Sequence, residues 1–89
     1  MKFRLSVQAK ADIQDIRVYH AQFGASVVAN VNDDIFDSFQ LILDFPDTGT
    51  RTDEHGLKRS VSTKYKYVIL HRKVGNTVEV RAIFRSQNR

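Results

Sequence analysis

Basic side chains are the one group of residues in this sequence that stands out as able to do chemistry. Seven of them gather in the second half of the chain: Lys58, Arg59, Lys64, Lys66, Arg81, Arg85 and Arg89. Residues 1–46 carry four Lys/Arg and six Asp/Glu, whereas residues 47–89 carry ten and four. Clustered guanidinium and ammonium groups bind phosphates and carboxylates. We therefore expect an anionic partner at the C-terminal half, either a nucleic acid or an acidic peptide.

Other residue types give weaker signals for chemistry. The histidines His20, His55 and His71 share no ligand spacing, and the chain has no cysteine, so no metal site is indicated. The triplet Asp53-Glu54-His55 lies in a polar stretch, where solvated side chains are the simpler interpretation. Asp33 and Asp37 are one helical turn apart, but hard cations need further oxygen ligands. We expect no catalytic group, metal or cofactor from these residues.

A β-hairpin over Lys64–Arg85 must position the basic residues. Two runs rich in β-branched and aromatic residues flank Gly75-Asn76, which is a signal for a two-residue turn. This turn predicts the pairs Val74–Thr77, Arg72–Glu79, Leu70–Arg81, Ile69–Ala82, Tyr67–Phe84 and Lys66–Arg85.

Alternation along both strands then sorts the hairpin into two faces. The apolar face should pack on helices and contains Tyr65, Tyr67, Ile69, His71, Val78, Val80, Ala82 and Phe84. The other face is mostly basic and contains Lys64, Lys66, Val68, Leu70, Arg72, Glu79, Arg81, Ile83 and Arg85. Two cations opposite each other, Lys66 and Arg85, are unfavourable unless an anion binds between them. Long side chains that splay apart into solvent are the alternative interpretation.

The first half of the chain predicts a strand followed by a helical hairpin. Lys2–Val7 alternates, with Phe3, Leu5 and Val7 on one side. A first helix runs from about Gln8 to Gly24, with an apolar stripe of Ala9, Ile13, Ile16, His20 and Phe23. A second begins near Ala25 and stops by Phe45, before Pro46. Its buried stripe is Val27 or Val28, Val31, Ile35, Phe39 and Ile42, and its outer surface carries Asp33, Asp34 and Asp37.

The remaining elements complete an α+β fold. Residues 46–56 have turn chemistry and predict a loop, and Leu57–Ser62 predicts a short strand. The expected order is β-α-α-β-β-β, with the helical hairpin packed on one face of a mainly antiparallel sheet. At 89 residues we expect one domain spanning residues 1–89. The charged N-terminus lacks a signal peptide pattern, and no apolar run approaches the roughly 20 residues that span a bilayer. We expect a cytoplasmic protein.

The whole chain resembles the ParE/RelE superfamily of toxins from bacterial toxin–antitoxin modules. The resemblance begins with L-S-x-x-A-x-x-D-I-x-x-I-x-x-Y over residues 5–19 and Gly24 between the helices. It continues with I-x-x-x-F-x-x-I-x-x-x-P-x-x-G over residues 35–49. The last pieces are Leu57-Lys58-Arg59, residues 65–69 and the closing V-E-V-R-A-I-F-R. Each piece is degenerate alone, but their order makes the match specific.

The resemblance implies two possible activities. RelE-like toxins cleave mRNA on the ribosome with scattered basic residues and commonly a C-terminal tyrosine. Here Arg59, Lys66 and Arg85 would be the matching cations, and no tyrosine follows Tyr67, so the set looks incomplete. ParE-like toxins inhibit DNA gyrase and need only a surface that engages it. A member that has lost toxicity and only binds its partner is a third possibility.

The ParE branch fits better, because the longer helical hairpin and the spacing of Leu57–Ile69 look more like it. The resemblance implies a cognate antitoxin, a ribbon-helix-helix protein with an acidic C-terminal segment that folds as it wraps the toxin. Lys58, Arg59, Lys64, Lys66, Arg81 and Arg85 would contact the target or the antitoxin, with Lys66, Arg81 and Arg85 as the central three. Neither sequence nor resemblance decides whether nucleic acid is bound directly. No contact with a membrane is expected.

Overall fold

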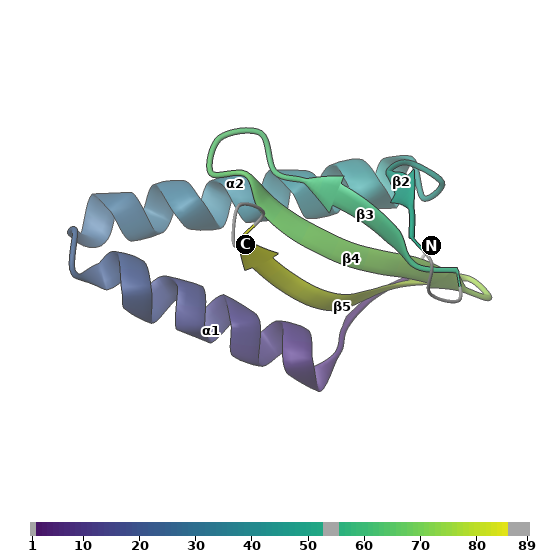
Figure 1. Ribbon diagram of the computed structural model, residues 1–89, viewed down its shortest axis with the longest axis horizontal. Coiled ribbons are helices and arrows are strands. Elements are labelled where there is room, and N and C mark those ends of the chain that lie inside the picture. Colours follow the sequence, from purple (N-terminus) through teal and green to yellow (C-terminus); the bar gives the residue numbers. More distant parts are fainter. Residues whose placement is uncertain (1, 53–55, 86–89) are drawn as a thin grey trace.

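Two long helices pack against one face of a five-stranded sheet in the computed structural model of the chain (Figure 1). The structure describes residues 2–52 and 56–85. The elements, in chain order, are β1 (Lys2–Leu5), α1 (Val7–Ala21), α2 (Ala25–Asp44), β2 (Thr50–Arg51), β3 (Lys58–Val61), β4 (Tyr67–Val74) and β5 (Thr77–Arg85). The Asp53-Glu54-His55 triplet and Arg89 lie outside the described residues. No helix in the described ranges has the length and apolar character to cross a bilayer.

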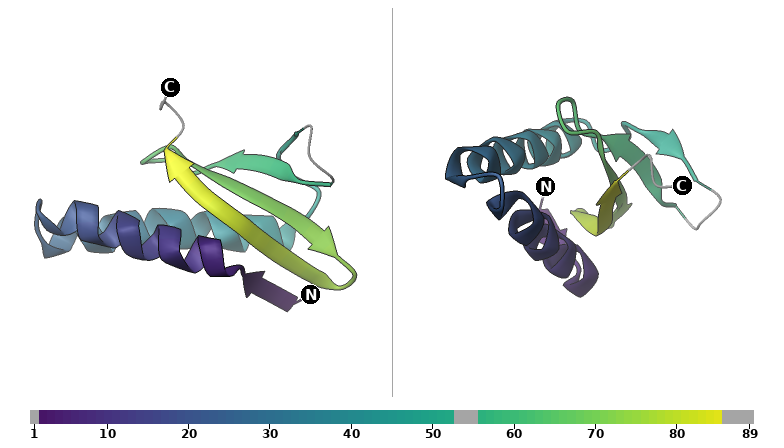
Figure 2. Two further views of the ribbon diagram at one scale, coloured as in Figure 1. Left: turned by 60° about the horizontal axis from the view of Figure 1, so that its bottom comes forward. Right: turned by 60° about the vertical axis from the view of Figure 1, so that its left-hand side comes forward.

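The sheet places the first strand of the chain beside the last one. Its strand order is β1-β5-β4-β3-β2, in which β1 runs parallel to β5 and every other neighbouring pair is antiparallel. Figure 2 shows both helices on the same side of this twisted sheet, so its other face is open. The predicted α+β class and helical hairpin are therefore confirmed.

Strand β2 lies inside the segment that the sequence predicts as a loop. Its two residues pair with Arg59 and Lys58, which is too short a run for alternation to reveal. The approach to β3 is close, because a Cβ atom at Gly49 would lie 2.9 Å from the Arg59 carbonyl oxygen. Gly49 also has a φ of 100°, so both the close contact and the backbone conformation favour glycine at this position.

Helix α1 starts and stops earlier than the periodicity predicts. Ser6 caps its N-terminus, since its hydroxyl accepts a hydrogen bond from the Ala9 amide at 3.0 Å. Val7, predicted as a buried strand residue, is thus the first helical residue and is 85% exposed. Phe23, predicted in the buried stripe, lies beyond the helix end at Ala21 and is 56% exposed.

The hydrophobic core follows the rest of the predicted helical stripes. Helix α2 spans the predicted residues, and both helices bury the expected side chains against the sheet. The core contains Ala9, Ile13, Ile16, Val31, Ile35, Phe39, Ile42, Tyr67, Ile69, Val78, Val80 and Ile83. Ile83 was predicted on the opposite face, and the hairpin register explains why it is here.

A β-bulge on β5 changes the predicted pairing of the hairpin. The turn and the pair Arg72–Glu79 are as expected, and His71 pairs with Val80. Leu70 then pairs with Ala82, which leaves Arg81 as an extra residue on β5. Every later pair shifts by one: Ile69–Ile83, Val68–Phe84 and Tyr67–Arg85. The predicted pairs Leu70–Arg81, Ile69–Ala82, Tyr67–Phe84 and Lys66–Arg85 are wrong.

Because of this shift, the residues of β5 after Arg81 lie on the opposite faces of the sheet from those predicted. Ile83 is 2% exposed and belongs to the core, whereas Phe84 is 45% exposed on the open face. Arg85 shares a face with its partner Tyr67 and therefore lies on the helix side of the sheet.

Asp34 of α2 fixes the turn that leads into β4. The sequence predicts it on the outer surface, but it is buried, and its carboxylate accepts hydrogen bonds from the backbone amides of Lys64 at 3.0 Å and Tyr65 at 2.8 Å. Burial by itself would raise the pKa of Asp34, but these hydrogen bonds outweigh it and hold the pKa below its usual value. The helix and the β3–β4 turn are thereby joined at one carboxylate.

The substitution Asp34→Asn tests this joint. One carboxylate oxygen becomes an NH₂ group that faces a backbone donor, so a buried amide loses its acceptor. We expect a loss of about 1–3 kcal/mol in the free energy of unfolding, measured in urea. The neighbouring exposed residue supplies the control, because Asp33→Asn should change the free energy by less than about 0.5 kcal/mol. Equal effects of the two substitutions would contradict the assignment.

Candidate functional site

Three arginines from three strands surround Glu79 on the open face of the sheet. The Arg4 Nη2 atom lies 2.8 Å from Glu79 Oε2, and Arg72 Nε lies 3.1 Å from Glu79 Oε1. The Arg81 Nη1 atom is 3.9 Å from the same Oε1. Arg4 and Arg72 are the register partners of Glu79 on either side, so the pairing of β1, β5 and β4 assembles this group. We call Arg4, Arg72, Glu79 and Arg81 the arginine cluster.

The arginine cluster has one anion for three cations. The Glu79 side chain is 11% exposed, and burial alone would raise its pKa, but hydrogen bonds and charges from Arg4 and Arg72 lower the pKa overall. Glu79 therefore stays ionised and holds the guanidinium groups in place. Since one carboxylate cannot satisfy the five donors of each arginine, the cluster keeps donors for a bound anion.

The sheet separates the basic residues that the sequence groups together. Arg81 belongs to the arginine cluster, and Arg59 lies on the same open face, since it pairs with Leu70. Lys58 pairs with the buried His71 on the helix side, and its Nζ atom donates to the Asp47 carbonyl at 3.2 Å. Arg85 also lies on the helix side. Of these four residues, Arg59 and Arg81 share the open face, whereas Lys58 and Arg85 lie on the helix side.

Lys64 and Lys66 lie outside the paired strands. Both belong to the segment between β3 and β4, and both are exposed. Lys66 has a φ of 61°, the left-handed region that few residues other than glycine adopt. It precedes β4 and has no strand partner in the described chain, so the predicted contact with Arg85 across the hairpin is absent.

Arg4 and Arg72 are functional candidates that the sequence does not single out. Alternation with Phe3 and Leu5 correctly indicates that Arg4 points away from the core. In the sequence, Glu79 lies 75 residues from Arg4, and the two meet in a parallel pairing that no local pattern encodes.

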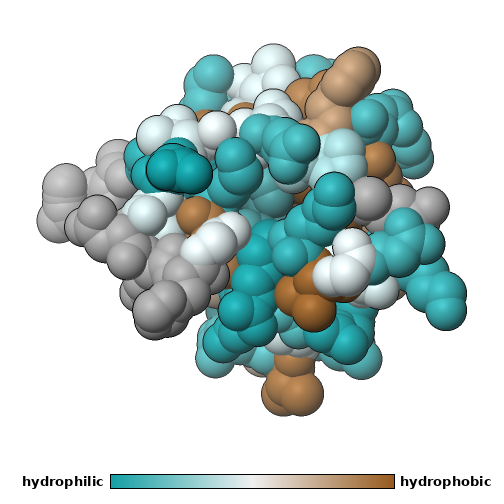
Figure 3. Space-filling view, turned by 90° about the vertical axis from the view of Figure 1, so that its right-hand side faces the viewer, coloured by the Kyte–Doolittle hydropathy of each residue, from teal (hydrophilic) through white to brown (hydrophobic). Residues whose placement is uncertain are grey.

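Hydrophilic residues cover most of the visible surface at the end of the molecule near the β4–β5 turn, and apolar ones are scattered (Figure 3).

A second group of polar residues surrounds Arg85 on the helix side. Its guanidinium carbon lies 5.5 Å from the centre of the Tyr19 ring, a cation–π contact between β5 and α1. The buried Tyr67 hydroxyl lies 3.0 Å from His20 Nε2. The His20 Nδ1 atom is buried and has no hydrogen-bond partner within the described ranges.

His20 and Tyr67 are held in their neutral forms. Burial, and then the positive charge of Arg85, lower the pKa of His20. Burial raises the pKa of the Tyr67 hydroxyl, although Arg85 opposes that rise. Neither group is adjusted toward proton transfer near neutral pH, because general acids and bases work best with a pKa close to the working pH. Both candidate surfaces are suited to binding anions.

Comparison with known proteins places this chain in a family. Residues 3–89 match the family model described as ParE toxin of type II toxin-antitoxin system, parDE. The chain belongs to the ParE toxin family. Such a toxin has an antitoxin as its partner. No curated protein matches the chain.

Two solved structures support the ParE fold of the chain. One is described as the chromosomal ParDE TA system from P. aeruginosa, with a TM-score of 0.85 and 16% identity over 98% of this chain and 97% of that one. The other is the intact E. coli RelBE toxin-antitoxin complex, with a TM-score of 0.62 and 9% identity over 98% of both chains. At these identities the likeness concerns the fold.

Glu79→Gln tests how the arginine cluster stabilises this ParE chain. We expect the free energy of unfolding at pH 7 to fall by about 1–3 kcal/mol, because two charge-assisted hydrogen bonds lose their charged acceptor. The folded pKa of Glu79 lies below its unfolded value, so the stabilisation is complete above the ordinary pKa of about 4.3. It is lost as the pH falls through the folded pKa. The difference between wild type and variant should therefore narrow in acid. A gap that stayed constant down to pH 2 would contradict this account, and the exposed Asp37→Asn is the control.

The lowered pKa of the buried His20 predicts that the folded protein loses stability at mildly acidic pH. Its folded pKa lies below the unfolded value of about 6.5, so protonation favours the unfolded chain as the pH drops through that value. We expect wild type to lose up to about 1.4 kcal/mol per pH unit below it on this account. The glutamine side chain of His20→Gln can still form a hydrogen bond with the Tyr67 hydroxyl and does not titrate. Because the pKa of the buried His71 is lowered too, the test is the difference between wild type and variant, measured by urea unfolding from pH 7.5 to 5. A difference that did not vary with pH would show that His20 is not the group involved.

Proposed function

We propose that this member of the ParE family is a toxin that inhibits DNA gyrase and is neutralised by its antitoxin. Family membership supports the toxin role, and the arginine cluster is the observation that carries the proposal. It presents three guanidinium groups around one carboxylate on the open sheet face, without a titratable group suited to catalysis among them. Such a surface can engage an anionic partner without cleaving it.

The open sheet face is the proposed contact with the target. Arg59 and Arg81 extend it toward β3 and β5, and both are exposed. Lys64 and Lys66 in the β3–β4 turn, and Lys58 on the helix side, would add only long-range attraction, which speeds association more than it tightens binding. The partner we expect on this face is the gyrase–DNA complex, whose cleaved state the toxin would trap.

The mRNA-cleaving alternative needs Arg59, Lys66 and Arg85 to act on one phosphodiester. Arg59 lies on the open face and Arg85 on the helix side, beside Tyr19. A single scissile bond would not meet both side chains. We therefore favour inhibition of gyrase over ribosome-dependent cleavage.

An assay with purified components tests the proposal directly. The antitoxin-free protein is incubated with DNA gyrase, ATP and relaxed plasmid, and the DNA is analysed after protein digestion. We expect supercoiling to be lost and linear DNA to accumulate. Unchanged supercoiling at high molar excess of the toxin would reject gyrase as the target.

The double variant Arg59→Gln/Arg81→Gln tests the surface. It removes two exposed charges from the open face and leaves Arg4 and Arg72 on Glu79. We expect the concentration for half-maximal inhibition to rise at least about tenfold, equivalent to about 1.4 kcal/mol of binding. The matched control Lys10→Gln/Arg17→Gln removes two exposed charges from α1 and should change it by less than about threefold. Equal effects would argue against a specific role of the open face.

A further inference from the structure

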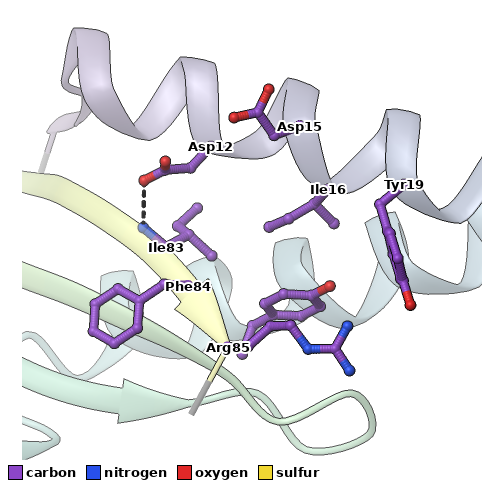
Figure 4. Close-up of a pocket in the computed structure, with 8 residues that line it drawn as sticks. Asp12, Asp15, Ile16, Tyr19, Ile83, Phe84 and Arg85 are labelled. Carbon is purple, nitrogen blue, oxygen red and sulfur yellow. Dashed lines mark hydrogen bonds between the residues drawn. The ribbon is translucent and has the colours of Figure 1, made fainter. Parts of the chain in front are cut away.

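A groove separates α1 from the C-terminal half of β5, on the side of the sheet opposite the arginine cluster (Figure 4). It has a volume of about 250 Å³ and is lined by Asp12, Asp15, Ile16, Tyr19, Tyr67, Ile83, Phe84 and Arg85. The groove exists because β1 pairs with β5 only as far as Val80, after which α1 replaces a strand beside β5. The bulge at Arg81 then turns Ile83 and Arg85 toward α1.

Arg85 carries the available charge of this groove. Of its two acidic residues, Asp12 already accepts hydrogen bonds from the Ile83 amide at 2.9 Å and from the Gln8 side chain at 2.7 Å. Figure 4 shows the Asp15 carboxylate directed away from β5. Within residues 2–52 and 56–85, Arg85 makes no ion pair, whereas the three arginines of the cluster share Glu79.

The surroundings of Arg85 prepare it to bind a carboxylate. The cation–π contact with the Tyr19 ring restrains the guanidinium, which reduces the entropy lost when a bidentate partner binds. Figure 4 shows the Arg85 and Tyr19 side chains together at one end of the groove. The neighbouring His20 ring is neutral, and its Nδ1 atom is buried. The positive charge at this end of the groove therefore belongs to Arg85.

The size and rim of the groove fit side chains of a protein better than a small molecule. Pockets for small molecules usually measure roughly 300–1,000 Å³. This groove is smaller, and exposed aromatic rings continue from it along the end of α1: Tyr19 is 46% and Phe23 56% exposed, with ring centres 5.6 Å apart. Exposed aromatic surface of this kind marks protein interfaces.

We propose that this groove is an anchoring site for the antitoxin, which inserts an apolar side chain against Ile16 and Ile83 and pairs a neighbouring carboxylate with Arg85. The inference rests on the proposed neutralisation by an antitoxin and names where on the toxin one contact is made. The open sheet face then serves the target, and the groove serves the antitoxin. The charge of Arg85 selects an acidic segment, and the aromatic rim extends its apolar contact.

Calorimetric titration with the cognate antitoxin tests the site, using the wild-type toxin and the variants Arg85→Gln, Arg85→Lys and Lys73→Gln. We expect Arg85→Gln to weaken binding at least about tenfold, the loss of one charge-assisted hydrogen-bonded pair. Arg85→Lys should recover part of that loss, because lysine keeps the charge but not the planar fork. The control Lys73→Gln removes one exposed positive charge beside the β4–β5 turn, away from the groove, and should change affinity by less than about threefold.

The pKa of His20, followed by NMR, separates the charge of a bound carboxylate from a loss of contact area. Burial lowers this pKa first and the charge of Arg85 second, so a carboxylate bound to Arg85 should offset the second effect. We therefore expect antitoxin binding to shift the pKa of His20 upward in wild type relative to its shift in Arg85→Gln. Wild-type affinity in Arg85→Gln, a larger effect of Lys73→Gln, or the same shift of the His20 pKa in both toxins would each overturn the proposal. A toxin that does not inhibit gyrase could still bind the antitoxin through this groove. The gyrase proposal and the groove proposal can therefore fail separately.

Discussion

Two hydrogen bonds, one at Arg81 and one two residues later at Ile83, connect the bulge in β5 to the start of α1. The Ser6 hydroxyl donates to the Arg81 carbonyl at 2.8 Å, and the Ile83 amide donates to the Asp12 carboxylate at 2.9 Å. Ser6 also caps α1, so one residue ends β1, begins the helix and satisfies the irregular backbone of β5. An unpaired backbone group at such an edge would cost roughly 1–3 kcal/mol. The position of α1 and the bulge therefore depend on each other, and the groove between them depends on both.

Local patterns in the sequence predict the elements of this fold well and their side-to-side contacts poorly. The stripe from Ala9 to His20 and the Gly75-Asn76 turn depend on neighbours within a few residues, and both appear as predicted. The Ser6 hydrogen bond to the bulge, the parallel pairing of β1 with β5 and the two amides on Asp34 join residues about 30 to 75 positions apart. Asp34 illustrates the difference, since its sequence position resembles that of an exposed acidic residue, and only the turn beside it explains its burial.

The candidate site shows the same limit in its charges. A count of cations predicts an anionic partner for the C-terminal half, but one inserted residue decides the face on which each cation lies. Arg81 and Arg85 are four positions apart, which in a regular strand means the same face. The bulge instead leaves Arg81 near Glu79 and turns Arg85 to Tyr19. Composition therefore indicates that the C-terminal half is basic, whereas the division of the basic residues into two surfaces required the register.

The two proposed binding surfaces lie on opposite faces of the sheet, which constrains how an antitoxin could block the proposed target surface. If its anchor occupies the groove beside Arg85, it must either cover the open face with a further segment or exclude the target by its bulk. The chain measures 39 × 29 × 23 Å, and an extended peptide spans about 3.3 Å per residue. A segment of roughly ten residues could thus run from the groove around the β1 edge to the arginine cluster. Since Arg4 lies on that edge strand, acidic residues at the far end of such a segment would meet the cluster first at Arg4.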